Sequence, residues 1–404
     1  MPDRADKTTA DATAELVPTV DHVEEAERRI RSLVRETPML AAGELSRRVG
    51  AAVVLKAENL QRTGSFKPRG ALNKMAQLSQ EELKAGVVTA SAGNHGQGVA
   101  LAARQLDTHA VVFMPSEAPL AKVEAVKGYG AEVRQIKGAF DQAERAARRL
   151  AGEEGKTFVP PFDDHDVIAG QGTVGLEIVR QAPETRVVVV PLGGGGLASG
   201  VAMAVQSQVP DARVVGVQAE GRAGSTICDG IAVKRPGRIT TPFIGRYLDD
   251  VVSVNDDEAA EAMVLLLERS KLVVEGAGAV GVAALMHGKV ELPKDGQTCV
   301  ILSGGNVDAT LLAECIRLGE TAAGRRLVLV TVIPDKPGSL EKVLHIIAER
   351  GANVVDVEHL REGIDLHVRE TAVQLVLQTR GREHGDEITT AIEAEGFSVR
   401  VERA

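Results

Sequence analysis

The stretch Val187-Val-Val-Val-Pro-Leu-Gly-Gly-Gly-Gly-Leu197 places a run of apolar residues directly before four glycines. The run has the length of a buried β-strand, and a helical pattern starts at Ala198. Because glycine has no Cβ atom, successive backbone amides can close around an anion at the N-terminus of that helix. The stretch therefore predicts a phosphate site at a strand-to-helix junction. A flexible hinge is the alternative, but it explains four consecutive glycines after a buried strand poorly.

Short apolar runs of the same kind recur along the chain, each followed by a glycine-containing loop and a helical pattern. They show little alternation of apolar and polar residues, so both faces of each strand should be buried. This is typical of a mainly parallel sheet flanked by helices, and we predict an α/β fold. The predicted strands are 52–55, 87–89, 110–114, 187–192, 214–217 and 299–302. Before them, Asp21 with Glu24 has the form of a helix N-cap and its partner.

The pattern changes at residues 318–326, a small, polar, glycine-containing stretch that suits a domain boundary. Beyond it, strand and helix patterns follow in the order βαββαβ, which is the ferredoxin-like arrangement. We therefore predict four segments. They are a flexible N-terminal tail at 1–20, a main domain at 21–318, a linker at 319–326 and a C-terminal domain at 327–404.

The composition excludes several classes of protein. The 404 residues are 44% hydrophobic and 25% charged, as in soluble globular proteins, and the formal net charge is −9. Because the chain is acidic, it offers no positive charge to attract the phosphates of a nucleic acid. Seven Phe, two Tyr and no Trp leave few aromatic rings on which bases could stack, so nucleic acid is not an expected partner. No apolar run is long enough to span a membrane, and the N-terminus has no secretory pattern. Three scattered cysteines indicate a reducing compartment, and we expect a cytoplasmic protein.

A lysine lies in Thr63-Gly-Ser-Phe-Lys-Pro-Arg-Gly70, shortly after a predicted strand. Partial burial at a strand-to-helix junction would lower the pKa of the Lys67 amine and free it for Schiff-base formation. A solvated loop lysine is the ordinary alternative. Lys67 therefore indicates a catalytic site only together with the other motifs of the chain.

The segment Ser91-Ala-Gly-Asn-His-Gly-Gln-Gly98 follows another predicted strand and opens a helix. Its backbone N–H groups and the helix dipole favour a carboxylate at that end, and Asn94 can add a directional hydrogen bond. The alternative is a tight turn with an ordinary helix cap and His95 as a core histidine.

Two later segments add polar groups. Cys299-Val-Ile-Leu-Ser-Gly-Gly-Asn306 ends a buried strand at Ser303, where open α/β sheets bind ligands. Gly276-Ala-Gly-Ala-Val-Gly281 matches the dinucleotide-binding pattern, but it lacks the strand and acidic residue that complete that unit. We interpret its glycines as close helix packing near the site, with Glu275 facing it.

In their order and spacing these five segments resemble the threonine ammonia-lyases (threonine dehydratases), which are fold-type II pyridoxal-phosphate enzymes. The resemblance covers residues 21–318. It implies a tryptophan-synthase-β-like fold with two open sheets, in which a small subdomain at about 56–155 is inserted in a larger one. It also implies pyridoxal 5′-phosphate as the cofactor.

The resemblance assigns roles to individual residues. Lys67 would hold the cofactor as a Schiff base and act as the general base, Phe66 would pack on the ring, and Asn94 would bond its 3′-hydroxyl. Ser303 would contact the pyridine nitrogen. The backbone amides that would hold the phosphate are those of Gly193, Gly194, Gly195, Gly196 and Leu197. The residues that would contact the substrate are Ser91, Ala92, Gly93, Asn94 and His95.

The implied reaction is β-elimination from L-threonine or L-serine to 2-oxobutanoate or pyruvate and ammonia. A serine at the ring nitrogen favours prompt loss of the β-hydroxyl over transamination. Threonine and cysteine synthases carry Ser-Gly-Asn-Thr where this chain has Gly93-Asn-His95, and serine racemases place a second catalytic serine at the position of Ala92. Some relatives begin a divalent-cation site with Glu at the position of Gln218, so we predict no metal here.

The C-terminal unit, with Asp335-Lys-Pro-Gly-Ser-Leu340 at its first strand–helix turn, resembles an ACT regulatory domain. Such domains bind small effectors, commonly amino acids, and the candidate contacts are Asp335, Gly338 and Asn353. We expect allosteric control of a homodimer or homotetramer, with isoleucine as the effector that the pathway suggests. For this unit, a dimerisation module without a ligand is the alternative. For the whole protein, the alternative to the lyase is a non-catalytic amino-acid sensor that uses this unit while the main domain only serves as a scaffold.

Overall fold

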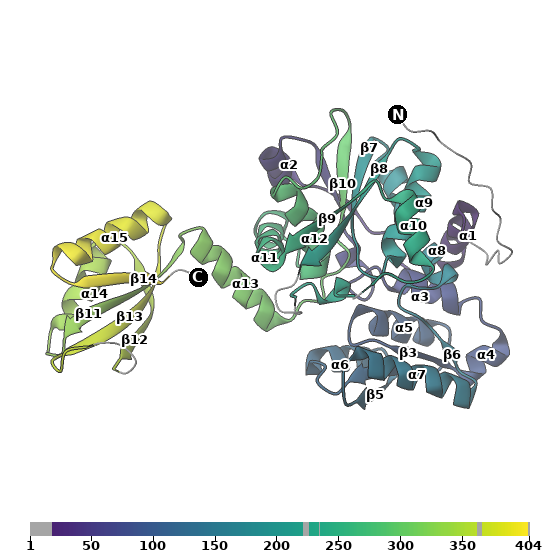
Figure 1. Ribbon diagram of the computed structural model, residues 1–404, viewed down its shortest axis with the longest axis horizontal. Coiled ribbons are helices and arrows are strands. Elements are labelled where there is room, and N and C mark those ends of the chain that lie inside the picture. The colour runs from purple at the N-terminus through teal and green to yellow at the C-terminus, as the bar shows by residue number, and fades with distance from the viewer. Residues whose placement is uncertain (1–17, 221–225, 234, 362–365, 403–404) are drawn as a thin grey trace, which may run out of the picture. The chain divides into compact units, whose positions relative to one another are not determined.

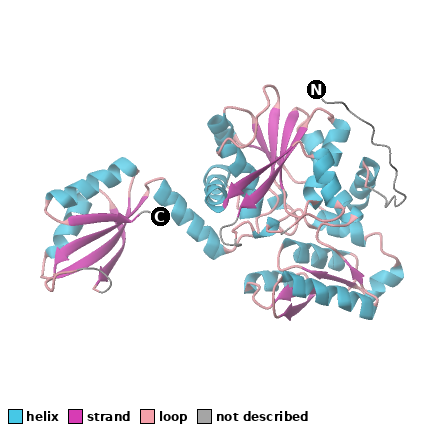
Figure 2. Ribbon diagram, viewed as in Figure 1, coloured by secondary structure: helices cyan, strands magenta, loops and turns pink. Residues whose placement is uncertain are grey.

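The computed structural model describes residues 18–220, 226–233, 235–361 and 366–402. The chain divides into two compact units, Met1–Asp308 and Ala309–Ala404 (Figure 1). The first unit holds two sheets that are flanked by helices, and the second holds one sheet (Figure 2).

The larger sheet of the first unit has six strands in the order β1-β2-β10-β7-β8-β9. All neighbouring strands are parallel except β1 and β2. The strands are β1 (Met39–Ala41), β2 (Val53–Lys56), β7 (Thr185–Pro191), β8 (Arg213–Glu220), β9 (Asp250–Asn255) and β10 (Gln297–Ile301). The predicted parallel α/β sheet is thus confirmed.

Helices cover both faces of this sheet (Figure 1). Val188 and Val190 of β7 pack with α8 and α9 on one face, while Gly281 of α12 lies against Val189 and Val300 on the other. The larger subdomain contains the helices α1 (Val20–Ile30), α2 (Gly43–Val49), α8 (His165–Gln181), α9 (Gly196–Gln208), α10 (Thr240–Tyr247), α11 (Asp256–Leu265) and α12 (Gly276–Met286). Shorter 3-10 turns lie at η1 (Glu58–Leu60) and η2 (Asp229–Ile231), and a π-helical turn lies at η3 (Leu266–Ser270).

The smaller sheet is formed by the segment between β2 and α8. Its four strands are all parallel, in the order β5-β4-β3-β6. They are β3 (Val87–Ala90), β4 (Ala110–Pro115), β5 (Glu132–Ile136) and β6 (Thr157–Phe158). Helices α5 and α6 pack on one face and α7 on the other. The helices are α3 (Pro68–Met75), α4 (Gln80–Ala85), α5 (Asn94–Gln105), α6 (Leu120–Gly128) and α7 (Phe140–Glu154).

The first helix begins earlier than predicted. Its N-cap is Thr19 rather than Asp21, and the Thr19 backbone N–H donates to Nδ1 of His22 at 3.1 Å. The expectation of Asp21 as N-cap was wrong because a histidine ring nitrogen replaces the carboxylate of the usual capping pair. Of the expected tail, residues 1–17 lie outside the described part of the chain.

The second unit has the predicted βαββαβ order and an antiparallel sheet in the order β12-β13-β11-β14. The apolar sides of α14 and α15 bury Leu329, Val373 and Leu375 of this sheet. The ferredoxin-like arrangement is confirmed. Its elements are β11 (Arg326–Pro334), α14 (Ser339–Glu349), β12 (Asn353–Leu360), β13 (Glu370–Gln378), α15 (Arg382–Ala394) and β14 (Ser398–Glu402).

Half of the stretch expected to link the two domains is helical. Helix α13 (Ala309–Ala322) runs through the first half of the predicted linker and belongs to the second unit. Only residues 323–325 separate it from β11, and Gly324 adopts a left-handed φ of 69° after the helix. Gly319 does not interrupt the helix because a single glycine costs about 1 kcal/mol there, and helix formers surround it.

Candidate active site

Lys67 immediately precedes α3, whose first residue is Pro68. Its Nζ donates a hydrogen bond of 2.9 Å to the carbonyl oxygen of Pro161 and lies 5.1 Å from the centre of the Phe66 ring. Burial lowers the pKa of the Lys67 amine to about 8, and the charge of Glu275 opposes that shift. Lys67 is therefore a lysine whose amine is readily deprotonated, not a solvated loop lysine.

The segments around Lys67 are held together by their main chains. The Phe66 N–H donates to the Ser303 carbonyl oxygen at 3.1 Å, and Ser65 pairs with Gly304 in a short antiparallel bridge. A Cβ atom at Gly98 in α5 would lie only 3.1 Å from the Lys67 carbonyl carbon. The lysine segment therefore contacts the helix after β3 and the loop after β10, where the carboxyl ends of strands from both sheets meet.

The glycine loop Gly193–Leu197 enters α9 with Gly195 at a φ of 92°, a left-handed conformation that favours glycine. A Cβ atom at Gly194 would lie 2.4 Å from the ring of Phe162, and one at Gly195 would lie 2.8 Å from Thr240. Neither position has room for a side chain. The first-turn N–H groups of α9 have no acceptor within the helix, so they can serve an anion, as the sequence predicts.

Three residues that the sequence motifs did not indicate hold this loop in place. Phe162 packs against the glycines, and the carboxylate of Asp163 accepts hydrogen bonds from the backbone N–H groups of Arg238 (3.0 Å) and Ile239 (2.7 Å). The neighbouring Thr240 hydroxyl donates to the Gly194 carbonyl oxygen at 2.7 Å. The run Pro160-Pro161-Phe162-Asp163 is a recognisable non-helical segment before α8, but nothing in it points to the glycine loop.

The segment Ser91–His95 forms the turn between β3 and α5. The Ser91 hydroxyl accepts a hydrogen bond of 3.1 Å from the Gly93 N–H, while Ala92, Gly93 and Asn94 are partly exposed. His95 is buried, and its Nε2 lies 3.0 Å from the carbonyl oxygen of Val159. Burial, followed by the charge of Lys67, lowers the pKa of His95 to about 3. Its side chain matches the core-histidine alternative, so His95 could contact a substrate only through its main chain.

Ser303 is buried at the end of β10, with its Oγ 3.5 Å from the Ala277 carbonyl oxygen of α12. A Cβ atom at Gly278 would lie 2.5 Å from the Gly304 carbonyl oxygen, which confirms close packing of this glycine-rich helix.

The start of helix α12 brings Glu275 to the site, where its Oε1 accepts a 2.7 Å hydrogen bond from Nδ2 of Asn94. Burial, followed by the charge of Asp229, raises the pKa of Glu275 to about 7.

These residues fit pyridoxal phosphate group by group. Lys67 offers an amine of lowered pKa for an aldehyde, and the glycine loop offers the first-turn N–H groups of α9 for the phosphate, with no room for a Cβ atom at Gly194 or Gly195. Ser303 offers a neutral hydroxyl. Among the residues that the structure describes, no group of three His, Cys, Asp or Glu side chains is arranged to hold a metal ion.

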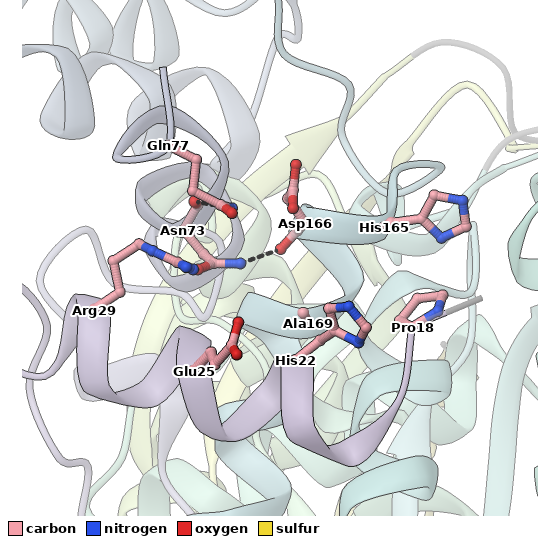
Figure 3. Close-up of a pocket in the computed structure, with 9 residues that line it drawn as sticks. All are labelled: Pro18, His22, Glu25, Arg29, Asn73, Gln77, His165, Asp166 and Ala169. Carbon is pink, nitrogen blue, oxygen red and sulfur yellow. Dashed lines mark hydrogen bonds between the residues drawn. The ribbon is translucent and has the colours of Figure 1, made fainter. Parts of the chain in front are cut away.

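A separate pocket of about 140 Å³ lies between α1, α3 and α8 (Figure 3). Within it the Asn73 side chain donates a hydrogen bond of 2.7 Å to the Asp166 carbonyl oxygen. The lining residues are Pro18, His22, Glu25, Arg29, Asn73, Gln77, His165, Asp166 and Ala169. None of them is a predicted site residue, so this pocket is distinct from the cofactor site.

The three candidate effector contacts do not meet within one chain. Asp335 and Gly338 lie after β11, where Asp335 pairs with Arg361 at 3.1 Å. Asn353 pairs in register with Gln378, which also faces Arg326 at the opposite end of β11. Asn353 lies at the other end of the sheet because α14 carries the chain back along the sheet before β12 begins. Asn353 could join the other two only from a second copy.

Residues 30–304 match the family model described as "Pyridoxal-phosphate dependent enzyme". The chain therefore belongs to this family, and the resemblance seen in the motifs is confirmed at that level. The L-threonine ammonia-lyase of Thermotoga maritima is 44% identical over 95% of this chain and 99% of its own length.

Solved structures agree with the family assignment. The processed form of threonine deaminase isoform 2 from Solanum lycopersicum is 35% identical, with a TM-score of 0.68 over 74% of this chain and 90% of its own. Maize serine racemase is 34% identical, with a TM-score of 0.71 over 74% of this chain and 97% of its own. In the described residues, no helix is long and apolar enough to cross a membrane.

Proposed function

We propose that the protein is a carbon–nitrogen lyase that deaminates L-threonine and, less rapidly, L-serine, releasing 2-oxobutanoate or pyruvate with ammonia. The observation that carries the proposal is the Lys67 amine at the meeting point of the glycine loop, Asn94 and the neutral hydroxyl of Ser303. The similarity to an L-threonine ammonia-lyase over nearly the full length of both chains supports it.

Bound pyridoxal phosphate supplies an electron sink for the charge that develops at the substrate Cα atom. Nζ of Lys67, whose pKa is lowered by burial, would take the Cα proton as general base. The backbone N–H groups at the start of α5 bind the substrate carboxylate. Ser303 would meet the ring nitrogen with a neutral hydroxyl instead of a carboxylate, so this side chain would supply no negative charge to hold a proton there. The β-hydroxyl leaves as water, and hydrolysis of the released enamine consumes one water and frees ammonia.

Racemisation is the second candidate reaction, because maize serine racemase shares the fold at 34% identity. It needs a proton donor on the face of the substrate opposite Lys67. The position that holds a second serine in racemases is Ala92 here, and a methyl group cannot carry a proton. We therefore favour elimination.

The C-terminal unit would regulate the enzyme by binding an amino acid at the turn of Asp335 and Gly338. Its ferredoxin-like fold supports this part of the proposal. Isoleucine is the first effector to test, in a cytoplasmic homodimer or homotetramer. An isoleucine-dependent change in the KM for threonine that Asp335→Ala removes would support regulation at this turn. No change with isoleucine would favour a dimerisation module or another effector.

The deciding experiment is release of 2-oxo acid from L-threonine and L-serine by the purified protein with pyridoxal phosphate. Lys67→Ala should abolish turnover and covalent attachment of the cofactor without unfolding the chain. Lys74→Ala is the matched control, because Lys74 lies in α3, the helix that follows Lys67, and pairs with Asp164 and Asp166 away from the site. Formation of D-serine without oxo acid would favour a racemase, and unchanged turnover in Lys67→Ala would refute the mechanism.

A further inference from the structure

Three polar side chains from different parts of the first unit form a closed set of hydrogen bonds beside Lys67. Asn94 begins α5, Glu275 precedes α12 and Asn306 follows β10. Nδ2 of Asn94 donates to Oε1 of Glu275 at 2.7 Å, and Nδ2 of Asn306 donates to Oδ1 of Asn94 at 2.7 Å. The Asn306 backbone N–H bonds to the Glu275 carboxylate and completes the set.

This arrangement determines which way the Asn94 amide points. The Thr63 carbonyl oxygen accepts a hydrogen bond of 2.7 Å from Nδ2 of Asn306. The NH₂ group of Asn306 must therefore face Thr63 and Asn94. The oxygen of Asn94 must then face Asn306. At the other end an ionised Glu275 can only accept, so it holds the NH₂ group of Asn94. Both ends select the same orientation.

One donor of Asn94 remains for a ligand. Within the described part of the chain, the amide oxygen is engaged by Asn306 and one N–H by Glu275, whereas the second N–H has no acceptor. Asn94 is partly exposed, while Glu275 is 5% exposed. The Glu275 carboxylate is therefore buried on the inner side of Asn94. It is not the acceptor for the second N–H of Asn94, which remains for a ligand on the exposed side.

We propose that Glu275 and Asn306 are positioning residues that hold Asn94 as a hydrogen-bond donor toward the anionic ring oxygen of the cofactor. This inference rests on the proposed function, because that function assigns the ring oxygen to Asn94. Without the two partners, the Asn94 amide could rotate and present its oxygen, which would repel the same group.

The charge state of Glu275 supports this role. The charged groups that face it are Asp229, Lys122 and Lys67, and its pKa lies near 7. When Glu275 is protonated, it can donate as well as accept, so its end of the set no longer selects the orientation of Asn94 and only Asn306 does. The ionised form is therefore the one that orders Asn94.

The test compares full-length Glu275→Ala, Glu275→Gln and Asn306→Ala with wild type. The readouts are the Kd of the cofactor-free protein for pyridoxal phosphate, the visible absorption of the bound cofactor against pH, and the thermal midpoint. Loss of one oriented hydrogen bond should weaken cofactor binding about threefold to tenfold in Glu275→Ala and Asn306→Ala. Glu275→Gln keeps an acceptor for Asn94 and should recover most of the affinity, but it should lose the pH dependence of the absorption that Glu275 causes.

Asn59→Ala is the matched control, since it removes a 3.1 Å hydrogen bond to the Val273 carbonyl oxygen in the segment before Glu275. It should leave the affinity and the absorption unchanged. A double-mutant cycle adds Glu275→Ala to Asn94→Ala, and the second substitution should then have no further effect on the Kd.

Additive effects in the cycle, or an equal change in Asn59→Ala, would overturn the inference. So would wild-type affinity and absorption in both Glu275→Ala and Asn306→Ala. If Glu275→Ala does not fold, Asn306→Ala and Glu275→Gln still decide. These readouts need no turnover, so a failure of the lyase proposal would show separately as a wild-type protein that binds the cofactor but releases no oxo acid.

Discussion

Arg69 and Glu177 lie 108 residues apart in sequence and meet in the interior through two hydrogen bonds of 2.6 and 3.0 Å. Arg69 also makes two 2.8 Å bonds to Glu58, and Lys56 binds Glu177 at 2.6 Å. Because Arg69 stands two residues after Lys67, this buried group of two cations and two carboxylates ties the lysine segment to α8 and β2. It forms part of the framework behind the site.

Replacing Arg69 with methionine should destabilise the protein by about 3 to 5 kcal/mol, because buried Glu58 would lose its cation and Glu177 would keep only Lys56. Urea unfolding followed by circular dichroism would measure the shift. Arg47→Met is the control, since Arg47 pairs with Glu44 but is 76% exposed and should contribute less than about 1 kcal/mol. Equal shifts for the two variants would contradict the proposed importance of the buried group.

The lowered pKa of Lys67 predicts how the cofactor-free protein takes up pyridoxal phosphate. Only the uncharged amine attacks an aldehyde, so the rate of Schiff-base formation should rise about tenfold per pH unit below pH 8 and level off above it. Stopped-flow absorbance between pH 6 and 10 measures this, with Lys67→Ala as the blank. A rate that keeps rising to pH 10 would show that Lys67 has an ordinary pKa.

His95 predicts a loss of stability in acid. Its pKa is about 3 in the folded protein and near 6.5 when unfolded, so the unfolded chain binds more protons between these values. Stability should therefore fall as the pH drops from 6.5 toward 3, by up to about 5 kcal/mol from this group. Urea titrations at pH 7, 5.5 and 4.5 should show a shallower pH dependence in His95→Gln. The same slope in both proteins would assign the acid sensitivity elsewhere.

The glycine loop should tolerate no side chain. Gly195→Ala would force a left-handed residue and place its Cβ against Thr240, so binding of pyridoxal phosphate should weaken at least tenfold. Equilibrium dialysis measures the affinity. Gly152→Ala in α7 is the control, because nothing lies within 4 Å of its Cβ position and alanine favours the helix. Unchanged affinity in Gly195→Ala would argue against the loop as the phosphate site.

Local patterns in the sequence were sufficient for the class of fold and for the segments that converge on Lys67. Buried strands such as 187–192 read as uninterrupted apolar runs because both faces of a parallel sheet are covered, and glycines after them mark close backbone approach. The ferredoxin-like order was equally visible, because each of its helices shows one apolar side.

Contacts between distant segments were not visible, because no local pattern records which side chain a residue will meet. Only the tertiary structure places Phe162 on the glycine loop and binds Glu275 to Asn94. Asn353 lies away from Asp335 for the same reason. Helix α14 carries the chain back along the sheet between them, so the position of Asn353 in the sheet does not follow from the residues beside it in sequence. The sequence by itself determined the types of chemical group and the strand ends that carry them. Packing of the two sheets and their helices decided which of these groups touch, and so which of them can act on one another.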